Sequence, residues 1–279
     1  MIDPLLRRLG VLSTSQLAEL GLARHHRDAA VAQGGLVQVR RGWYAAADAD
    51  PAVVAAVRAE GCVACASALR LHGVWVPESM GAGHVRHARH RREQGRRGCL
   101  PYGPNPPVRA AVDDVETAFR CALRCGSRED VVVLADSLLH RRLATHGDLA
   151  AWSSEAPRRV AALLSATAWA ESGVESIVRV RLRVRRIGVR TQVQIGPWRV
   201  DLVVGDRLVV ECDGAEHHGD WRAHAADRAR DRGLVAAGYL VVRLTYRQVI
   251  DDWPAVEQDL LALVRRGAHR RSNHRRDAR

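Results

Sequence analysis

The sequence has no lysine, few aromatic residues and no long hydrophobic run. All 43 positively charged residues are arginines, and aromatic residues make up only 4% of the chain. Alanine, leucine and valine must therefore fill most of the core. No stretch approaches the roughly 18 consecutive apolar residues of a membrane-spanning helix, so we expect no membrane segment. The opening residues MIDPLLRRLG lack the regions of a secretory signal, which predicts a cytoplasmic protein.

The chain is long and strongly basic. Its 279 residues, 47% of them hydrophobic, are enough for one large domain or two modest ones. The net charge of +12 favours a polyanionic partner, and nucleic acid is the commonest one. Arginine suits that partner because its planar fork binds phosphate through two hydrogen bonds. An arginine-rich surface that only contacts water is the alternative.

The six cysteines leave two interpretations open. Cys62 and Cys65 have the CxxC spacing of zinc and redox sites, within a segment, GCVACASALRLHGV, that predicts a helix. Cys121 and Cys125 share the face of another predicted helix. One interpretation is a zinc site drawn from these four. The sequence favours the other, in which reduced cysteines act as small apolar core residues.

Two segments are particularly basic. In HVRHARHRREQGRRG, residues 84–98, the histidines His84, His87 and His90 are three apart, which is compatible with metal binding. An arginine segment that faces solvent or phosphate is the favoured interpretation. The tail, residues 267–279, has almost no apolar residues and is predicted to be disordered and loosely attracted to nucleic acid.

Residues 1–48 are predicted to form a small unit. Ser13 or Thr14 caps a helix that stops at Gly21, and a second helix ends at the glycine pair 34–35. The segments LVQVR and WYAA then form a hairpin around an Arg41–Gly42 turn. Two short helices followed by a hairpin predict a winged helix-turn-helix.

This unit contains candidate DNA contacts. The recognition helix of such a unit places its N-terminal end against base edges, and the hairpin tip reaches phosphates. The residues predicted at these places are Arg24, His25, His26 and Arg27 on the helix and Arg40 and Arg41 on the hairpin. The segments GVLSTSQLAELGL and GGLVQVRRGWYAA, with the basic helix between them, resemble the N-terminal domain of AbiEi-type antitoxins. That resemblance implies a DNA-binding repressor module; a helical cap without DNA contact is the alternative.

Residues 49–170 are predicted to be a mostly helical middle segment. Apolar spacing close to 3.6 residues predicts helices over 112–126 and 127–144, the second capped by Ser127. Thr145 caps another. The segment SALRLHGVW resembles the part that follows the winged helix in the same antitoxin-like proteins. No catalytic group of residues stands out here.

Residues 171–266 predict a different architecture. A helix up to Gly188 is followed by the strands VRTQVQI, WRVDLVV and RLVVECD, with turns at Gly196–Pro197 and Gly205–Asp206. A helix that stops at Gly238, the strand YLVVRL and one or two closing helices complete the order α-β-β-β-α-β-α. Three consecutive strands and a helical crossover to a fourth predict a mixed α/β sheet.

Acidic residues lie on two of these strands. Glu211 and Asp213, two apart on the third strand, share a face, and the hairpin can bring Asp201 beside Glu211. Carboxylates gathered at one place repel one another, and a divalent cation relieves that repulsion. Oxygen ligands suit Mg²⁺ or Mn²⁺, which activates water for attack on a phosphodiester. An exposed strand end that prevents aggregation is the alternative.

The segment from Val200 to Arg243 resembles a nuclease family. Its VDLVV, LVVECDGAEHH and DxxRDxxL motifs resemble the PD-(D/E)XK core, and more closely the uncharacterised relatives of the very-short-patch-repair (Vsr) mismatch endonuclease. The resemblance implies that Asp201 and Glu211 hold the metal, with Asp213 as an assisting ligand. It also implies that His217 transfers a proton or positions the attacking water.

Further roles follow from the same resemblance. Glu175 matches an acid that these proteins often carry in the preceding helix. Arg230 either stabilises the pentavalent phosphate or pairs with Asp227 or Asp231. One departure concerns the lysine that the broad PD-(D/E)XK pattern places two residues after the glutamate, where this chain has Asp213. The Vsr-like branch also lacks that lysine and uses histidine instead.

The sequence therefore predicts a metal-dependent DNA endonuclease with an N-terminal DNA-binding module. The alternative is a non-enzymatic DNA-binding regulator of antitoxin type that uses the nuclease fold as a scaffold. Whether RNA is the substrate, whether the chain forms a homodimer and whether it has a toxin partner are left open.

Overall fold

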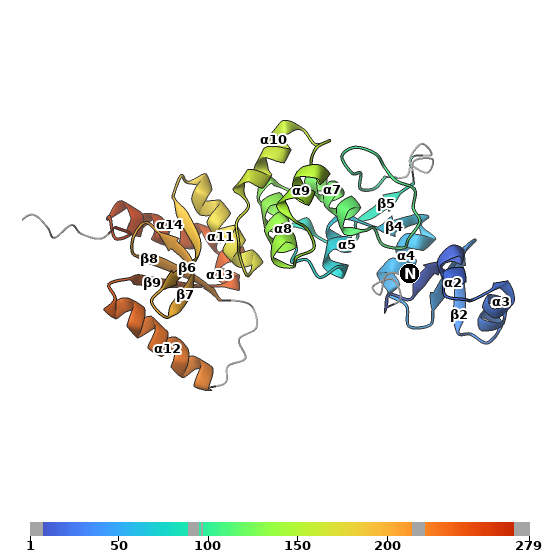
Figure 1. Cartoon of the computed structure of the whole chain (residues 1–279), viewed down its shortest axis with the longest axis horizontal. Helices are drawn as coiled ribbons and strands as arrows, with labels where there is room; N and C mark the ends of the chain where they lie inside the picture. The colour runs from blue at the N-terminus through green and yellow to red at the C-terminus, as the bar shows by residue number, and fades with distance from the viewer. Residues whose placement is uncertain (1–7, 89–94, 96, 214–220, 271–279) are drawn as a thin grey trace, which may run out of the picture. The chain divides into compact units, whose positions relative to one another are not determined.

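The structure is a computed structural model that describes residues 8–88, 95, 97–213 and 221–270, and of residues 221–227 the backbone only. The chain divides into two compact units, Met1–Ser165 and Ala166–Arg279 (Figure 1). In the described ranges, no helix has the length and apolar character to cross a membrane. The two units are described separately.

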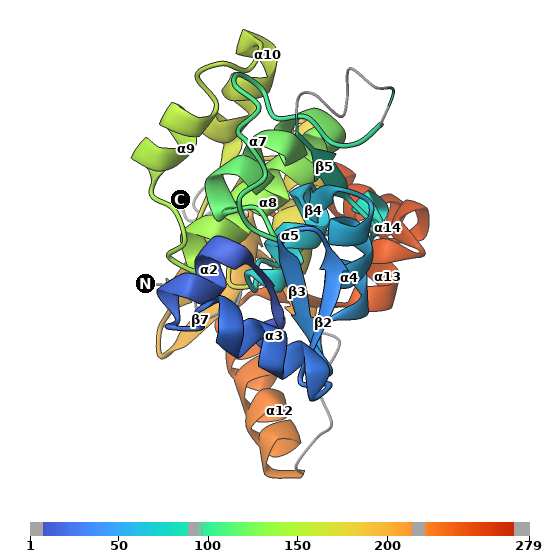
Figure 2. The same cartoon turned by 90° about the vertical axis from the view of Figure 1, so that its right-hand side faces the viewer.

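The first unit begins with a small antiparallel sheet and two helices. Its elements are β1 (Val11–Ser13), α2 (Thr14–Glu19), α3 (Arg24–Ala32), β2 (Leu36–Arg40) and β3 (Trp43–Ala46). The strands lie in the order β1-β3-β2, and Figure 2 shows α2 and α3 beside the β2–β3 hairpin. Ser13 caps α2 by accepting from the Gln16 amide, while the Gln16 side chain accepts from the Ser13 amide. The predicted helices and hairpin are present, and β1 is an addition that the sequence did not indicate.

The rest of this unit is mostly helical. Its elements are α4 (Pro51–Arg58), β4 (Gly61–Val63), α5 (Cys65–Leu71), η1 (Glu78–Met80), β5 (Val85–His87), α7 (Val115–Cys125), α8 (Arg128–His140), α9 (His146–Trp152), α10 (Arg158–Ala161) and η2 (Ala162–Ala166). Reciprocal side-chain and backbone hydrogen bonds cap α8 at Ser127 and α9 at Thr145, as predicted. A short sheet, β4 paired with β5, was not predicted.

The prediction of one helix through Cys62 and Cys65 is wrong. Residues Gly61–Val63 form β4, because they pair with β5 across the intervening chain. A Cβ at Gly61 would approach the Val85 side chain to 2.5 Å, so only glycine allows this close pairing. Cys65 instead begins α5 with a positive φ of 51°. The two cysteines therefore do not share a helix face.

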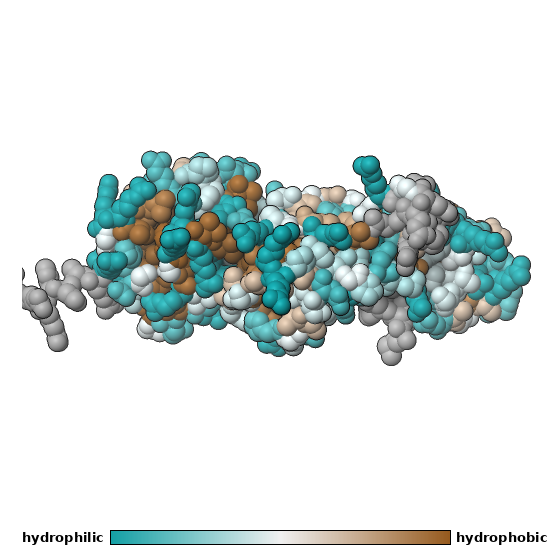
Figure 3. Space-filling view, turned by 90° about the horizontal axis from the view of Figure 1, so that it is seen from above, coloured by the Kyte–Doolittle hydropathy of each residue, from teal (hydrophilic) through white to brown (hydrophobic). Residues whose placement is uncertain are grey.

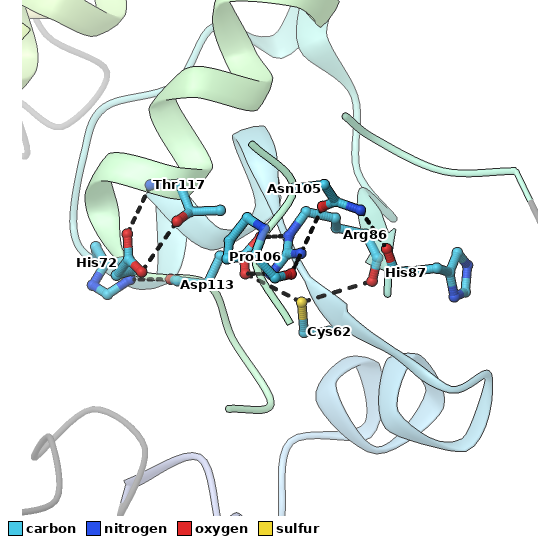
Figure 4. A network of polar contacts seen from close by, with 9 residues as sticks. Cys62, His72, Arg86, His87, Asn105, Pro106, Asp113 and Thr117 are labelled. Atoms are coloured by element: carbon cyan, nitrogen blue, oxygen red, sulfur yellow. Dashed lines mark hydrogen bonds and ion pairs between the residues drawn. The ribbon is translucent and has the colours of Figure 1, made fainter. Parts of the chain in front are cut away.

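A buried ion pair fixes β5 in the first unit (Figure 4). Arg86 is 2% exposed and binds Asp113 through two hydrogen bonds of 2.8 and 2.5 Å. Its remaining nitrogen donates to Asn105 Oδ1 and to the Pro106 carbonyl. The basic segment was predicted to face solvent or phosphate. For Arg86 this is wrong, because its buried guanidinium pairs with the carboxylate of Asp113.

One hydrophobic core serves the whole first unit. Its buried members extend from Leu9 and Trp43 through Val53 to Phe119 and Leu149. The predicted winged-helix segment and the helical middle segment thus contribute to one core, although the sequence suggested separate parts at residue 48.

The second unit is a four-stranded mixed sheet with helices. Its elements are α11 (Gly173–Val184), β6 (Val189–Ile195), β7 (Trp198–Val204), β8 (Leu208–Asp213), α12 (Trp221–Ala236), β9 (Leu240–Thr245), α13 (Tyr246–Ile250) and α14 (Trp253–Arg265). The strand order is β6-β7-β8-β9, antiparallel except for the parallel pair β8–β9 that α12 connects. Figure 1 shows α12 below the sheet and α11 and α14 above it. The mixed α/β class predicted for this part is confirmed.

Two close contacts hold this unit together. A Cβ at Gly233 would lie 2.1 Å from the Trp198 ring, so the glycine lets α12 approach β7. The His269 carbonyl accepts hydrogen bonds from the amides of Asp206 and Arg207, at 2.8 and 3.2 Å. The tail that the sequence predicted to be disordered from residue 267 is therefore ordered up to residue 270. The rest of the tail, 271–279, lies outside the described residues.

Apolar side chains also reach the surface of the second unit. In the face drawn in Figure 3, brown residues gather on this unit, whereas the α3 region is coloured mostly hydrophilic. Val184 and Val235 are exposed apolar residues of this unit, at 75% and 60% exposure.

Candidate active site

Asp201 and Glu211 meet where β7 and β8 separate. The two strands pair regularly from Val204–Leu208 to Leu202–Val210, and beyond this point the Asp201 carboxylate accepts from the Cys212 amide at 2.9 Å. Glu211 is 4% exposed. Burial, together with the charge of the hydrogen-bonded Asp201 carboxylate, raises the pKa of Glu211 to about 8. The hairpin therefore brings these two acids into direct contact, as the sequence predicted.

Glu175 is a third acid near Asp201. It sits in the first turn of α11, where the Ser172 hydroxyl accepts from its amide. Its carboxyl group accepts from the Gln192 amide nitrogen at 2.7 Å and from the Glu171 backbone at 3.1 Å. Burial, followed by the charge of Asp201, raises the pKa of Glu175 to about 7. The charge of Asp201 on β7 thus acts on two buried carboxyl groups, one on α11 and one on β8.

Arg230 compensates part of this charge. From α12, its guanidinium donates to Glu211 Oε1 at 2.8 Å and to the Arg199 carbonyl at 2.5 Å. The sequence offered Asp227 or Asp231 as ion-pair partners, and Asp231 is not the partner. Arg230 reaches Glu211 instead, from the crossover helix α12 that connects β8 to β9. The side chain of Asp227 lies outside the described residues.

Asp213 belongs to a separate ion-pair group. Arg243 donates to Asp213 at 3.3 Å and to both oxygens of Asp231, at 3.1 and 3.0 Å. Among the described side chains, no three acids of this site have oxygens that all lie within 4.8 Å of one another. The expected convergence of Asp213 with Asp201 and Glu211 is therefore wrong, because Arg243 binds Asp213. Sequence reasoning missed Arg243, which the parallel register places opposite Glu211.

The match to known families covers this site. Residues 174–264 match the family REase_MTES_1575, a restriction-endonuclease-like family. The second unit carries a restriction-endonuclease-like domain. The match runs from α11 into α14 and includes Glu175, Asp201, Glu211, Asp213, Arg230 and Arg243. No significant match was found among curated proteins or among solved structures.

The nuclease-like domain contains a donor pair that suits a hard cation. Restriction-endonuclease-like folds commonly use divalent metals, and Mg²⁺ is usually bound by one or two carboxylates together with water and phosphate oxygens. Asp201 and Glu211 are two such carboxylates in contact, and burial, followed by the charge of Asp201, raises the pKa of Glu211 to about 8. A bound cation would favour the charged form of both acids. The predicted proton-transfer residue, His217, lies outside the described residues.

The predicted DNA contacts of the first unit have different environments. Arg24, His25, His26 and Arg41 are all exposed. Arg24 lies 3.8 Å from Asp28, and the two histidine rings contact each other with their Nε2 atoms 3.0 Å apart. These four side chains remain accessible to a polyanion.

Arg27 and Arg40 are held by the unit itself. Arg27 is 9% exposed, donates to the Leu22 carbonyl at 3.0 Å and lies over the Tyr44 ring. Arg40 is half-buried and lies 5.2 Å from the centre of the Trp43 ring. The predicted DNA contact of Arg27 does not fit its position in this structure, because the residue lies on the side of α3 that faces the sheet.

Proposed function

We propose that this chain is a divalent-metal-dependent DNA endonuclease, with Mg²⁺ or Mn²⁺ as the cation. In this proposal the nuclease-like domain hydrolyses phosphodiester bonds and the first unit binds DNA. The observation that carries it is the contact between Asp201 and Glu211 inside the segment that matches a restriction-endonuclease-like family. The net charge of +12 supports a nucleic acid as the substrate.

Each side chain has a distinct part in this proposal. Asp201 and Glu211 hold the cation, which when bound lowers the pKa of its water and neutralises charge on the phosphate. Arg230 orients the Glu211 carboxylate through their ion pair and places a fixed positive charge beside the site. Glu175, with its pKa near 7, can hold or release a proton at neutral pH. His217 is a second proton carrier, because the usual pKa of histidine also lies near neutrality.

The test is a cleavage panel with two active-site variants. Duplex, mismatched and single-stranded DNA, with RNA for comparison, are incubated with Mg²⁺ or Mn²⁺ and the wild-type protein, Asp201→Asn or Glu211→Gln. We expect cleavage to fall by more than the roughly 10–100-fold typical of a residue that only supports a metal ligand. DNA affinity, measured by fluorescence anisotropy, should stay close to that of the wild type.

Asp206→Asn is the matched control, because Asp206 is an exposed acid at the turn between β7 and β8. It should cleave like the wild type. Cleavage that persists in both active-site variants would exclude this site. Cleavage of RNA alone would retain the site and replace the substrate.

A non-enzymatic DNA-binding regulator is the second candidate. The observation that favours it is the pairing of Glu211 with Arg230 and of Asp213 with Arg243, since these arginines already compensate two acids without a cation. Calorimetric titration with Mn²⁺ separates the two candidates. A nuclease should show a binding event that Glu211→Gln removes, whereas a regulator should give the same titration with and without that substitution.

A further inference from the structure

A second group of chemically reactive side chains lies in the first unit, away from the acids of the nuclease-like domain. Cys65, His84, Cys99 and Cys125 each offer one ligand atom, and these atoms all lie within 4.8 Å of one another. In the described part of the chain, this is the only group of three or more such side chains. The proposed nuclease function makes no use of it.

The distances within this group suit a single small ion. Cys99 Sγ lies 3.8 Å from Cys125 Sγ and 3.3 Å from His84 Nδ1. Zinc binds thiolate at about 2.3 Å and imidazole at about 2.0–2.1 Å, so tetrahedral ligands are separated by about 3.4–3.8 Å. The observed separations are therefore close to those that one zinc ion requires.

Cys65 completes the set from inside the unit. It is fully buried, and its thiol is within hydrogen-bonding distance of both Cys125 and Cys99. Three thiols packed against one imidazole is an arrangement that core packing alone does not require, because a buried cysteine needs only apolar neighbours.

His84 has the orientation of a metal ligand. Its Nε2 lies 2.6 Å from the Met80 carbonyl, which can only accept, so this nitrogen carries the proton. Nδ1, which lies 3.3 Å from Cys99 Sγ, is then the nitrogen that would bind a metal. Metal-binding histidines usually donate their other ring N–H to a carbonyl or carboxylate in this way.

The backbone holds the four residues independently of their side chains. The Ala64 amide donates to the His84 carbonyl at 2.9 Å, and the Cys99 amide donates to the Val85 carbonyl at 2.8 Å. A Cβ at Gly98 would approach the same Val85 carbonyl to 2.5 Å, so glycine is needed where the segment bearing Cys99 passes β5. Cys125 is the last residue of α7. The ligand positions are thus preorganised by hydrogen bonds that no metal supplies.

We propose that Cys65, His84, Cys99 and Cys125 bind one zinc ion as a closed structural site. Four protein ligands leave no open position for substrate, which distinguishes a structural from a catalytic zinc site. Thiolate ligands select zinc over Mg²⁺ and Mn²⁺, so this site and the carboxylate site do not compete for one cation. The ion would link four parts of the unit: the start of α5 through Cys65, the residue before β5 through His84, the loop after β5 through Cys99, and the end of α7 through Cys125.

The other two cysteines of the unit provide matched controls. Cys62 donates to Asp113 Oδ1 at 3.3 Å and belongs to the network in Figure 4. Cys121 is fully buried in the core, one turn of α7 before Cys125. Because the network around Cys62 can accept a hydroxyl in place of the thiol, Cys62→Ser is the better control. It removes a cysteine of the same unit without touching the proposed site.

The test measures zinc in the full-length protein purified under reducing conditions. The zinc content is measured by inductively coupled plasma mass spectrometry. We expect one zinc per chain in the wild type and in Cys62→Ser, and none in Cys99→Ser or Cys125→Ser. Circular dichroism shows whether each variant is folded. Protein that is isolated without metal is reduced and titrated with Zn²⁺ and Co²⁺, and bound Co²⁺ should show the strong absorption of thiolate coordination.

Three results would overturn the proposal: failure of the reduced wild type to bind either ion, retention of zinc by a folded Cys125→Ser, or equal zinc loss in Cys62→Ser. If the reduced wild type binds neither ion and the unreduced protein contains a Cys99–Cys125 disulfide, these two cysteines would be assigned to redox chemistry instead. Zinc content should be unchanged in Glu211→Gln, so this proposal and the nuclease proposal can fail separately.

Discussion

At the scale of single residues, the acids of the nuclease-like domain carry the clearest physical signature. Glu211 and Glu175 are both buried, and each lies near Asp201. Burial, followed by the charge of Asp201, raises their pKa values to about 8 and about 7. A protein that needs only stability would not be expected to bury acids in contact with one another, because their charged forms are disfavoured there. Such perturbed groups are more typical of functional sites.

The raised pKa values predict how stability depends on pH. An acid whose pKa is higher in the folded than in the unfolded state stabilises the fold below its unfolded pKa, near 4.5, and this contribution is lost as pH rises through about 7 to 8. Without added divalent cations, the melting temperature should therefore fall by on the order of several °C from pH 5 to pH 8. Glu211→Gln should reduce that decrease, as measured by circular dichroism at a series of pH values.

Glu257→Gln is the control for this measurement. Glu257 pairs with Arg185, which lowers the pKa of the carboxyl group, so its contribution has the opposite sign. Removing it should not reduce the loss of stability between pH 5 and pH 8. An unchanged pH profile in Glu211→Gln would show that this carboxyl group is not protonated in the folded protein.

At the scale of elements, local signals predicted helices well. Ser127 and Thr145, each followed three residues later by an acid, indicated the starts of α8 and α9 because reciprocal hydrogen bonds need only those positions. The same kind of local reasoning failed for β4, a strand of three residues whose pairing partner lies 24 residues away, with Cys62 opposite Arg86. Strand pairing over such a distance leaves no periodic pattern in so short a segment.

The ion pair that fixes β5 should be important for stability. Asp113→Ala leaves the buried Arg86 charge without its partner and should destabilise the first unit by about 3–5 kcal/mol. Asp28→Ala removes an exposed pair with Arg24 and should change stability by at most about 1 kcal/mol. Urea unfolding followed by tryptophan fluorescence measures both. Equal effects of the two substitutions would show that Arg86 finds another partner.

At the scale of the whole molecule, the net charge of +12 makes a prediction about binding. DNA affinity should decrease linearly with salt on logarithmic axes, with a slope that falls by about 0.9 for each phosphate contact removed. The exposed residues Arg24 and Arg41 are the candidates for such contacts. Fluorescence anisotropy with the double variant Arg24→Ala/Arg41→Ala, between about 50 and 200 mM salt, should give a shallower slope than the wild type.

Arg27→Ala is the comparison for that experiment. Arg27 is held by the Leu22 carbonyl and the Tyr44 ring, so its loss should lower the stability of the first unit and leave the salt slope unchanged. A slope that depends on Arg27 as strongly as on Arg24 and Arg41 would mean that the residue turns outward to bind DNA. A slope unchanged in the double variant would place the DNA contacts elsewhere.

The sequence by itself determined the mixed α/β class of the second unit, the helix caps and the meeting of Asp201 with Glu211. Each of these depends on short-range information: hydrophobic alternation, a capping residue, or a tight turn that returns the chain beside itself. Only the tertiary structure decided which side chains contact one another. It assigned Arg230 to Glu211 and Arg243 to Asp213, turned Arg27 inward, and gathered Cys65 and Cys125 with His84 and Cys99 rather than with Cys62 and Cys121. These contacts join segments that are distant along the chain. The packing of helices and strands sets the geometry of the contacts, and a local sequence pattern does not predict that packing.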